Sequence, residues 1–180
     1  MTKGSNSIKS MTETKIAKKM LVIALGSNLG NRYAYIAQAK RLLQKKLGRA
    51  YKTSQVYETP PWGKTNQSSF LNSVACFSTN FPVEEGQQIC LEVEKKLGRI
   101  HEERWGKRCI DVDLLFYGGE IFESDNLVIP HPELHHRAFV LRPLMDVAAS
   151  FVHPKLELSV GHLFKALDEN KDFEIFSSCF

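Results

Sequence analysis

Apolar residues occur along the chain in short continuous runs, which alternate with stretches where they recur every three or four positions. A continuous run bounded by turn residues is typical of a buried strand, whereas recurrence at helical spacing is typical of an amphipathic helix. In chain order the pattern predicts strands at 20–25, 51–57, 70–79 and 109–117, with a helix after the first strand and another at 83–97. The order βαββαβ indicates an α+β fold, with a ferredoxin-like antiparallel sheet and helices packed on its faces.

The first predicted helix has recognisable ends. Apolar residues recur from Ile36 to Leu47 at helical spacing, and lysines and arginines occupy the remaining face. Asn28 or Asn31 could cap the start of this helix through a side-chain oxygen. Gly48 stands where a helix C-cap is expected. The chain should therefore turn tightly after its first strand and enter the helix directly.

A long loop is predicted between the second and third strands. Residues 57–69 contain Pro60 and Pro61, which fix the backbone φ angle and remove two hydrogen-bond donors. Loops of this length are often plain surface connections, but they also carry binding residues. Trp62, which we expect to be exposed directly behind the proline pair, keeps both interpretations open.

The elements predicted after the fourth strand are smaller. We expect a hairpin over 120–129, C-terminal helices over 137–149 and 159–167, and a kink or a restart of the former at Pro143. Residues 1–18 are polar and lack periodicity, so we expect them to be a disordered leader.

The composition narrows the class of protein. With 180 residues the chain can bury a sizeable core, and we expect residues 19–180 to form a single domain. A formal net charge of +4 suits a polyanionic ligand but falls short of a basic nucleic-acid-binding tail. The four cysteines include no CxxC pair, which favours free thiols in a reducing cytoplasm. No apolar run approaches the length of a membrane span, so we expect a cytoplasmic protein without a membrane partner.

The most informative stretch is the fourth strand together with the loop before it. The strand is apolar except for Asp111 and Asp113, which point to the same face because side chains alternate along a strand. Aligned carboxylates repel one another unless cations lie between them, and hard divalent ions suit this arrangement. The loop supplies Arg104, Lys107 and Arg108, so the stretch indicates phosphate chemistry with metal ions. The alternative is a pair of surface aspartates on an edge strand beside a solvated basic loop.

Eight short motifs then stand in order along the chain. They are Gly26–Leu29 (GSNL), Tyr57–Gly63 (YETPPWG), Phe70–Asn72 (FLN), Leu97–Arg99 (LGR), Arg104–Arg108 (RWGKR), Ile110–Leu115 (IDVDLL), Pro130–Pro132 (PHP) and Arg137–Leu144 (RAFVLRPL). From about Met20 to Leu167 the chain resembles the 6-hydroxymethyl-7,8-dihydropterin pyrophosphokinase family. Any one motif alone would be a weak signal, but eight in the same order are specific.

This resemblance implies a reaction in folate biosynthesis. In the family the hydroxymethyl oxygen of the pterin attacks the β-phosphorus of ATP, which gives the pterin diphosphate and AMP, and two magnesium ions assist. The resemblance therefore implies ATP and the pterin as substrates. We expect a monomer with no nucleic-acid partner.

The resemblance also implies roles for individual residues. Asp111 and Asp113 are implied as the magnesium ligands and, together with Arg99 and Arg108, as the catalytic set. The implied pterin-binding residues are Thr59, Pro60, Trp62, Phe70, Asn72 and Phe139. The implied ATP-binding residues are Glu94, Arg99, Arg104, Trp105, Arg108, Ile110, His131 and Arg137.

Four positions depart from the family pattern. His101 stands where another arginine is common, so one cationic contact should depend on pH. Lys107 stands where proline is usual, and Pro132 replaces a frequent tyrosine beside His131. Phe70 stands where many relatives have tyrosine, which should leave ring stacking intact.

Two other classes of protein share parts of this pattern. RNA-recognition modules have the same βαββαβ order and stack bases on sheet aromatics. However, the strand at 70–79 lacks their glycine-and-aromatic signature, and a base-stacking sheet would not carry Asp111 and Asp113 on its fourth strand. A catalytically inactive binding protein with the same fold is the other alternative, but no catalytic residue of the family pattern is missing.

Overall fold

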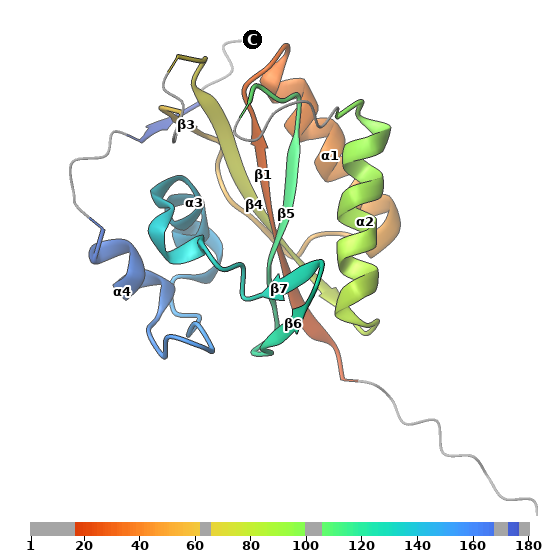
Figure 1. Ribbon diagram of the computed structural model, residues 1–180, viewed down its shortest axis with the longest axis vertical. Coiled ribbons are helices and arrows are strands. Elements are labelled where there is room, and N and C mark those ends of the chain that lie inside the picture. The colour runs from red at the N-terminus through yellow and green to blue at the C-terminus, as the bar shows by residue number, and fades with distance from the viewer. Residues whose placement is uncertain (1–16, 62–65, 100–105, 168–172, 177–180) are drawn as a thin grey trace, which may run out of the picture.

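The computed structural model describes residues 17–61, 66–99, 106–167 and 173–176. Within these residues a six-stranded sheet crosses the centre of the molecule, and helices lie on both of its faces (Figure 1). In chain order the elements are β1 (Lys19–Ser27), α1 (Arg32–Leu47), β2 (Lys52–Thr53), β3 (Tyr57–Thr59), β4 (Phe70–Thr79), α2 (Val83–Lys96), β5 (Asp111–Tyr117), β6 (Phe122–Ser124), β7 (Leu127–Ile129), the 3₁₀ helix η1 (Leu134–His136), α3 (Ala138–Ala148), α4 (Val160–Lys165) and β8 (Glu174–Ile175). The strand order is β5-β1-β4-β3-β8, β2 also pairs with β4, and all these pairings are antiparallel. The predicted antiparallel sheet with helices on its faces is confirmed.

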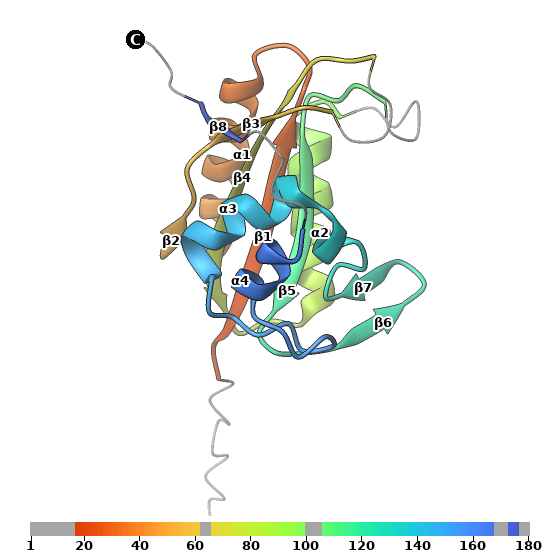
Figure 2. The same ribbon diagram turned by 90° about the vertical axis from the view of Figure 1, so that its left-hand side faces the viewer.

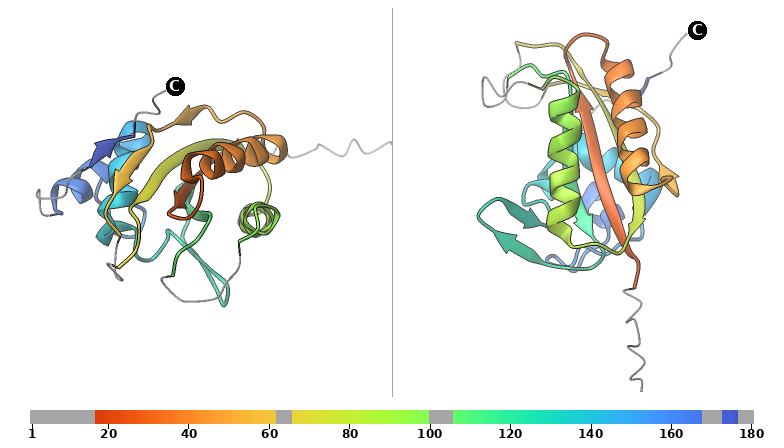
Figure 3. Two further views of the ribbon diagram at one scale, coloured as in Figure 1. Left: turned by 90° about the horizontal axis from the view of Figure 1, so that it is seen from above. Right: turned by 90° about the vertical axis from the view of Figure 1, so that its right-hand side faces the viewer.

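The helices form two layers. Figure 3 shows α1 and α2 next to one another over one face of the sheet, and Figure 2 shows α3 and α4 over the opposite face. Each layer has its own apolar cluster, one beneath α1 and α2 and the other beneath α3 and α4. The face that an RNA-recognition module uses to stack bases is therefore covered by helices in the part of the chain that the structure describes.

β1 is buried on both faces because it lies between these layers. Leu21, Ile23 and Leu25 pack toward α1 and α2, whereas Val22 packs toward α3 and α4. Successive side chains of a strand point to opposite faces, so a strand covered on both sides needs a continuous apolar run. Replacing Leu21, Ile23 or Leu25 by alanine should lower the free energy of unfolding by about 2–5 kcal/mol.

The ends of α1 follow the sequence signals. The side chain of Asn31 accepts a hydrogen bond from the backbone N–H of Ala34 at 3.0 Å, so Asn31 and not Asn28 is the cap. Gly48 follows the last residue with φ of 81°, and its N–H bonds the carbonyl of Gln44. A positive φ is easily adopted only by glycine, which explains why the helix ends there.

The prediction of one continuous strand over 51–57 is wrong, because two short strands, β2 and β3, replace it. The side chain of Ser54 accepts from the backbone N–H of Val74 at 2.8 Å, where a continuous ladder would use a carbonyl. The backbone N–H of Gln55 donates to the carboxylate of Asp146 in α3 at 3.1 Å. Hydrogen bonds to side chains therefore replace the backbone ladder between β2 and β3. The loop after β3 starts at Pro60 and is shorter than the predicted one over 57–69.

The fourth predicted strand also starts later than the apolar pattern indicates. β5 begins at Asp111, two residues after Cys109. The carbonyl of Cys109 accepts from the Ser27 hydroxyl at 2.6 Å, and the carbonyl of Arg108 accepts from the Asn28 N–H at 3.2 Å. The entry to β5 is therefore bonded to the turn after β1.

The C-terminal elements match the prediction in type. β6 and β7 form the expected hairpin, and Ser159 caps α4 by accepting from the N–H of His162. Pro143 lies inside α3, so the helix does not restart there. The short strand β8 lies beyond the last predicted helix, where no element was predicted, and it pairs with β3.

Two further expectations concern the chain as a whole. Among the described residues, no helix combines the length and the apolar character that a membrane span requires. The predicted leader, residues 1–18, lies outside the described residues except for Ala17 and Lys18, which are exposed.

Candidate functional site

A cleft with a volume of about 750 Å³ lies between the sheet and α3. Its walls come from β1, β3, β4, β5 and the segment from His131 to Pro143. The register of the sheet brings these walls together, because Gly26 of β1 pairs with Asn72 of β4 on one side and with Asp111 of β5 on the other. A methyl group on Gly26 would lie 3.2 Å from the Asn72 Oδ1. Glycine therefore permits the close approach of the two flanking side chains.

Most of the residues expected at the site line this one cleft. They are Thr59, Pro60, Phe70, Asn72, Arg99, Arg108, Asp111, Asp113, His131, Arg137 and Phe139. Glu94 lies behind Arg99, and the side chain of Ile110 is fully buried in the core beneath α1 and α2. Trp62, Arg104 and Trp105, and with them His101, lie outside the described residues.

The acidic wall of the cleft is β5. Asp111 and Asp113 are half-buried and lie on one face of the strand, while Val112 between them is buried in the core on the other. Burial raises the pKa of the Asp111 carboxyl, and the neighbouring charge of Asp113 raises it further. Positive charge from Arg108 and Arg99 opposes this rise. The two carboxylates thus form a site that additional positive charge would stabilise.

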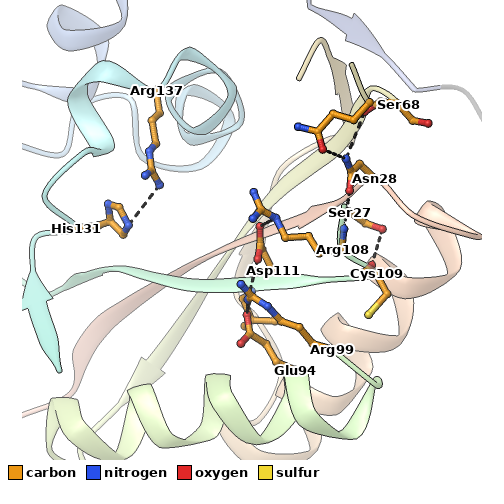
Figure 4. Close-up of polar contacts among 12 residues, drawn as sticks. Ser27, Asn28, Ser68, Glu94, Arg99, Arg108, Cys109, Asp111, His131 and Arg137 are labelled. Atoms are coloured by element: carbon orange, nitrogen blue, oxygen red, sulfur yellow. Dashed lines mark hydrogen bonds and ion pairs between the residues drawn. The ribbon is translucent and has the colours of Figure 1, made fainter. Parts of the chain in front are cut away.

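Two arginines from opposite ends of the basic loop converge on Asp111 (Figure 4). Nη1 of Arg99, which follows α2, lies 2.7 Å from Oδ1 of Asp111. Nε of Arg108, which precedes β5, forms an ion pair with Oδ2 of the same carboxylate. Arginine is suited to phosphate oxygens through several N–H groups in a fixed plane. The cleft therefore holds two side chains that suit phosphate oxygens beside two carboxylates that suit a metal ion.

Glu94 holds Arg99 from behind. Its carboxylate forms an ion pair with Arg99 and accepts from the backbone N–H of Val112 at 2.8 Å. The residue is only 4% exposed, and burial raises the pKa of its carboxyl to about 7 despite the opposing charge of Arg99. Glu94 thus orients Arg99 without lining the cleft itself.

The aromatic wall consists of Phe70 at the start of β4 and Phe139 near the start of α3. Phe70 is 9% exposed, and Phe139 is half-buried. Between the sheet strands, Nδ2 of Asn72 donates to Oγ1 of Thr59 at 2.8 Å. The cleft therefore combines two aromatic rings with a fixed pair of polar side chains, which suits a flat heterocycle.

The third wall contains His131 and Arg137. Nε2 of His131 lies 3.4 Å from Nη1 of Arg137 (Figure 4). Burial lowers the pKa of His131, although the charge of Asp113 acts in the opposite direction. An uncharged imidazole beside a guanidinium avoids repulsion between two cations.

Sequence reasoning missed several residues that line the cleft. Ser73, Val74, Val140 and Pro143 are apolar or small residues that line it through the packing of β4 and α3. Glu133 also lines the cleft, and its backbone N–H donates to Nδ1 of His131 at 3.2 Å. The position of Glu133, two residues after His131, is the one sequence feature that could have indicated its place in the cleft. No periodic pattern marks this residue.

Comparison with known proteins tests the resemblance independently of the site. Residues 22–149 match the model of the family described as 7,8-dihydro-6-hydroxymethylpterin-pyrophosphokinase (HPPK). The chain belongs to the HPPK family. The resemblance drawn from the eight motifs is thereby confirmed.

Relatives within the HPPK family include bacterial and fungal proteins. The 2-amino-4-hydroxy-6-hydroxymethyldihydropteridine pyrophosphokinase of Methylorubrum extorquens is 41% identical over 131 residues, which are 72% of this chain and 83% of that protein. The protein of the same name from Bacillus subtilis is 40% identical over 69% of this chain and 75% of its own length. The folic acid synthesis protein fol1 of Pneumocystis carinii is 39% identical over 91% of this chain, but the match spans only 22% of that longer protein.

Solved structures support the HPPK fold. A crystal structure of HPPK-DHPS in complex with substrates has a TM-score of 0.66 at 14% identity, over 83% of this chain and 43% of that one. The crystal structure of wild-type HPPK-DHPS of Plasmodium falciparum with pteroate has a TM-score of 0.67 at 16% identity. The match covers 82% of this chain and 44% of that chain. At these identities the likeness concerns the fold alone.

Proposed function

We propose that the cleft transfers the diphosphate group of ATP to the hydroxymethyl oxygen of 6-hydroxymethyl-7,8-dihydropterin. A bond forms between this oxygen and the β-phosphorus, the bond from the β-phosphorus to the oxygen that bridges it to the α-phosphorus breaks, and the hydroxyl proton is released. The products are the pterin diphosphate and AMP, as in folate biosynthesis. One observation carries the proposal: the aromatic pair and the arginine-carboxylate cluster line the same cleft in a chain of the HPPK family.

The pterin would occupy the aromatic end of the cleft. Phe70 and Phe139 would stack on the two faces of the ring, where offset contacts are favourable. Thr59 and Asn72 are already bonded to one another, and the exposed residue Pro60 lines the cleft beside them. These groups would bind the hydrogen-bonding edge of the ring with little loss of side-chain entropy.

The triphosphate would occupy the charged end. Arg99 and Arg108 both contact Asp111, so the phosphates would meet guanidinium groups that are already held in place. Groups that are positioned before the reaction stabilise developing charge more effectively than groups that must reorganise. His131 and Arg137 would contact the ATP from the opposite wall, and Glu94 would keep Arg99 oriented.

The acidic strand fits magnesium. Asp111 and Asp113 offer carboxylate oxygens, the ligands that a hard divalent cation prefers, and burial together with the neighbouring charge of Asp113 raises the pKa of Asp111. Within the described residues no group of three or more acidic, histidine or cysteine side chains is arranged around a metal position. This agrees with a cation held by one or two carboxylates and by the phosphates of ATP. When bound, two magnesium ions would offset charge on the triphosphate.

Some residue roles are carried over to this chain from the HPPK family. Trp62, Arg104 and Trp105 are proposed to act in the pterin and ATP sites, and Ile110 to border the ATP site through its backbone. The strand order β5-β1-β4-β3 supports classing the core as ferredoxin-like. We also propose one pyrophosphokinase domain over residues 19–180, acting as a cytoplasmic monomer without a nucleic-acid partner.

One assay tests the function. The protein is incubated with ATP, magnesium and 6-hydroxymethyl-7,8-dihydropterin, and nucleotide products are separated by chromatography. We expect AMP and the pterin diphosphate in equal amounts, and no AMP when the pterin is omitted. Formation of ADP would indicate transfer of a single phosphoryl group and would contradict the proposal.

A further inference from the structure

Two segments that border the cleft meet at one buried side chain, that of Asn28 (Figure 4). Asn28 follows β1 and is 2% exposed. Its Nδ2 donates to Oε1 of Gln67 at 3.0 Å and faces the carbonyl of Ser68 at 3.5 Å. Its Oδ1 accepts from the backbone N–H of Arg108 at 2.9 Å. A single amide group thus bridges the segment before β4 and the segment before β5.

The two ends of this amide group cannot be exchanged. A backbone N–H can only donate and a backbone carbonyl can only accept, so Oδ1 must face Arg108 and Nδ2 must face Ser68. The backbone N–H of Asn28 also donates to the carbonyl of Arg108 at 3.2 Å. Both backbone polar groups of Arg108 are therefore bonded to Asn28.

The two bridged segments carry opposite ends of the proposed reaction. Ser68 lies two residues before Phe70, which lines the pterin end of the cleft. Arg108 pairs with Asp111 at the phosphate end, and its guanidinium carbon lies 5.3 Å from the centre of the Phe70 ring. The placement of Arg108 relative to Phe70 consequently depends on the contacts of Asn28.

We propose that Asn28 is a positioning residue, which keeps the phosphate-binding Arg108 in register with the pterin-binding start of β4. This inference rests on the proposed function. Asn28 does not line the cleft, so it would act through Arg108 and the segment at Gln67 and Ser68. Because displacement of reacting groups by about 1 Å can lower a rate about a hundredfold, its loss should reduce turnover more than the binding of either substrate.

The substitution Asn28→Asp tests the bridge with the same side-chain shape. A carboxylate still accepts from Arg108, but it cannot donate to Gln67 or Ser68. We expect kcat for AMP release to fall about 10- to 100-fold, while each KM changes less than about threefold. Asn126→Asp, in the exposed turn between β6 and β7, adds the same charge and should leave all three constants unchanged.

A reversal of the hydrogen-bond direction makes the test specific. Gln67→Lys places a donor against the donor of Asn28, so this single change should also lower kcat. In the double variant Asn28→Asp with Gln67→Lys, the side chain at position 67 donates and the one at position 28 accepts. We expect kcat of this double variant to be about tenfold higher than kcat of Asn28→Asp alone. A double-mutant cycle would detect this difference as coupling between the two positions. Gln67→Lys also keeps the test open if a change at the buried Asn28 prevents folding.

The outcomes separate this inference from the function on which it rests. If the wild-type protein releases no AMP, the proposed function is wrong and the inference falls with it. If the wild type is active, three results would overturn the inference alone: unchanged kcat in Asn28→Asp, a loss of kcat that matches the loss of folded protein in circular dichroism, or strictly additive effects of the two changes.

Discussion

The guanidinium carbon of Arg108 lies 5.3 Å from the centre of the Phe70 ring. A cation over an aromatic face is attracted by about 0.5–2 kcal/mol, depending on how far it is removed from water. Arg108 also pairs with Asp111, so one side chain contacts both the aromatic and the acidic wall of the cleft. Arg108 therefore links the two ends of the cleft.

The aromatic pair should affect the two substrates unequally. We expect alanine at Phe70 or at Phe139 to weaken pterin binding by about 1–3 kcal/mol, because each change removes one stacking face. Binding of a non-hydrolysable ATP analogue should change by less than about threefold, since charge dominates that end of the cleft. Titration calorimetry with each ligand measures both effects, and Tyr51→Ala, an exposed aromatic outside the cleft, is the control. Equal weakening of both ligands would contradict a pterin sandwich.

Asparagine at Asp111 and at Asp113 should lower turnover alike, but the two changes should affect Tm differently. We expect Asp111→Asn and Asp113→Asn each to lower turnover at saturating magnesium by at least about two orders of magnitude, since charge and position are both lost. Asp113→Asn removes the like charge beside Asp111, so the ligand-free protein should gain slightly in Tm. Asp111→Asn also leaves Arg99 and Arg108 without their shared carboxylate, so this gain should be absent. Thermal melts and AMP assays provide the measurements.

A matched control for the aspartates is Asp125→Asn in the exposed hairpin turn, which changes the net charge equally. Its turnover and Tm should stay at wild-type values. Near wild-type turnover in both cleft variants would refute the metal assignment.

The buried carboxyl of Glu94 should make the stability of the ligand-free protein depend on pH. Burial raises its pKa from 4.5 to about 7, so between these values the folded protein retains a proton that the unfolded chain has released. This contribution to stability is complete below pH 4.5 and is lost as the pH rises through 7. Glu94→Gln cannot titrate, so it should gain relative to wild type by about 2–3 kcal/mol, or about 5–10 °C in Tm, between pH 5 and pH 8. A Tm difference that stays constant across this range would show that Glu94 does not titrate there.

The hydroxyl of Tyr57 should contribute to stability but not to turnover. It donates to the Asp146 carboxylate at 3.0 and 2.9 Å and joins β3 to α3. Because the acceptor is charged, Tyr57→Phe should lower the free energy of unfolding by about 1.5–3 kcal/mol. Urea denaturation measures the loss, while AMP release should stay unchanged. Tyr33→Phe, on the exposed face of α1, should leave both quantities at wild-type values.

The sequence predicts those elements whose signals are local. β4 begins and ends as the apolar run indicates, and α2 starts at the predicted Val83. The break between β2 and β3 could not be predicted, because Asp146, which binds the Gln55 N–H, lies far along the chain in α3. Side-chain hydrogen bonds between distant segments leave no periodic trace in the sequence.

The site follows the same division. Strand alternation is sufficient to predict that Asp111 and Asp113 share a face, because the relation is local. Local sequence signals allow either Asn28 or Asn31 as the helix cap, and the structure assigns the cap to Asn31. The contacts of Asn28 with Gln67 and Arg108 require the folded sheet. Positioning residues of this kind become visible only in the tertiary structure.

The place of β5 at the border of the sheet has a further consequence, for self-association. An exposed strand edge offers unpaired N–H and carbonyl groups with which another chain can form a sheet. On β5, however, the N–H of Val112 donates to the carboxylate of Glu94, and the carbonyl of Leu115 accepts from the N–H of His131 at 3.0 Å. A second molecule could extend the sheet here only by displacing both contacts and burying two aspartates. The contacts of Glu94 and His131 with β5 therefore also protect this edge of the sheet against pairing with another chain.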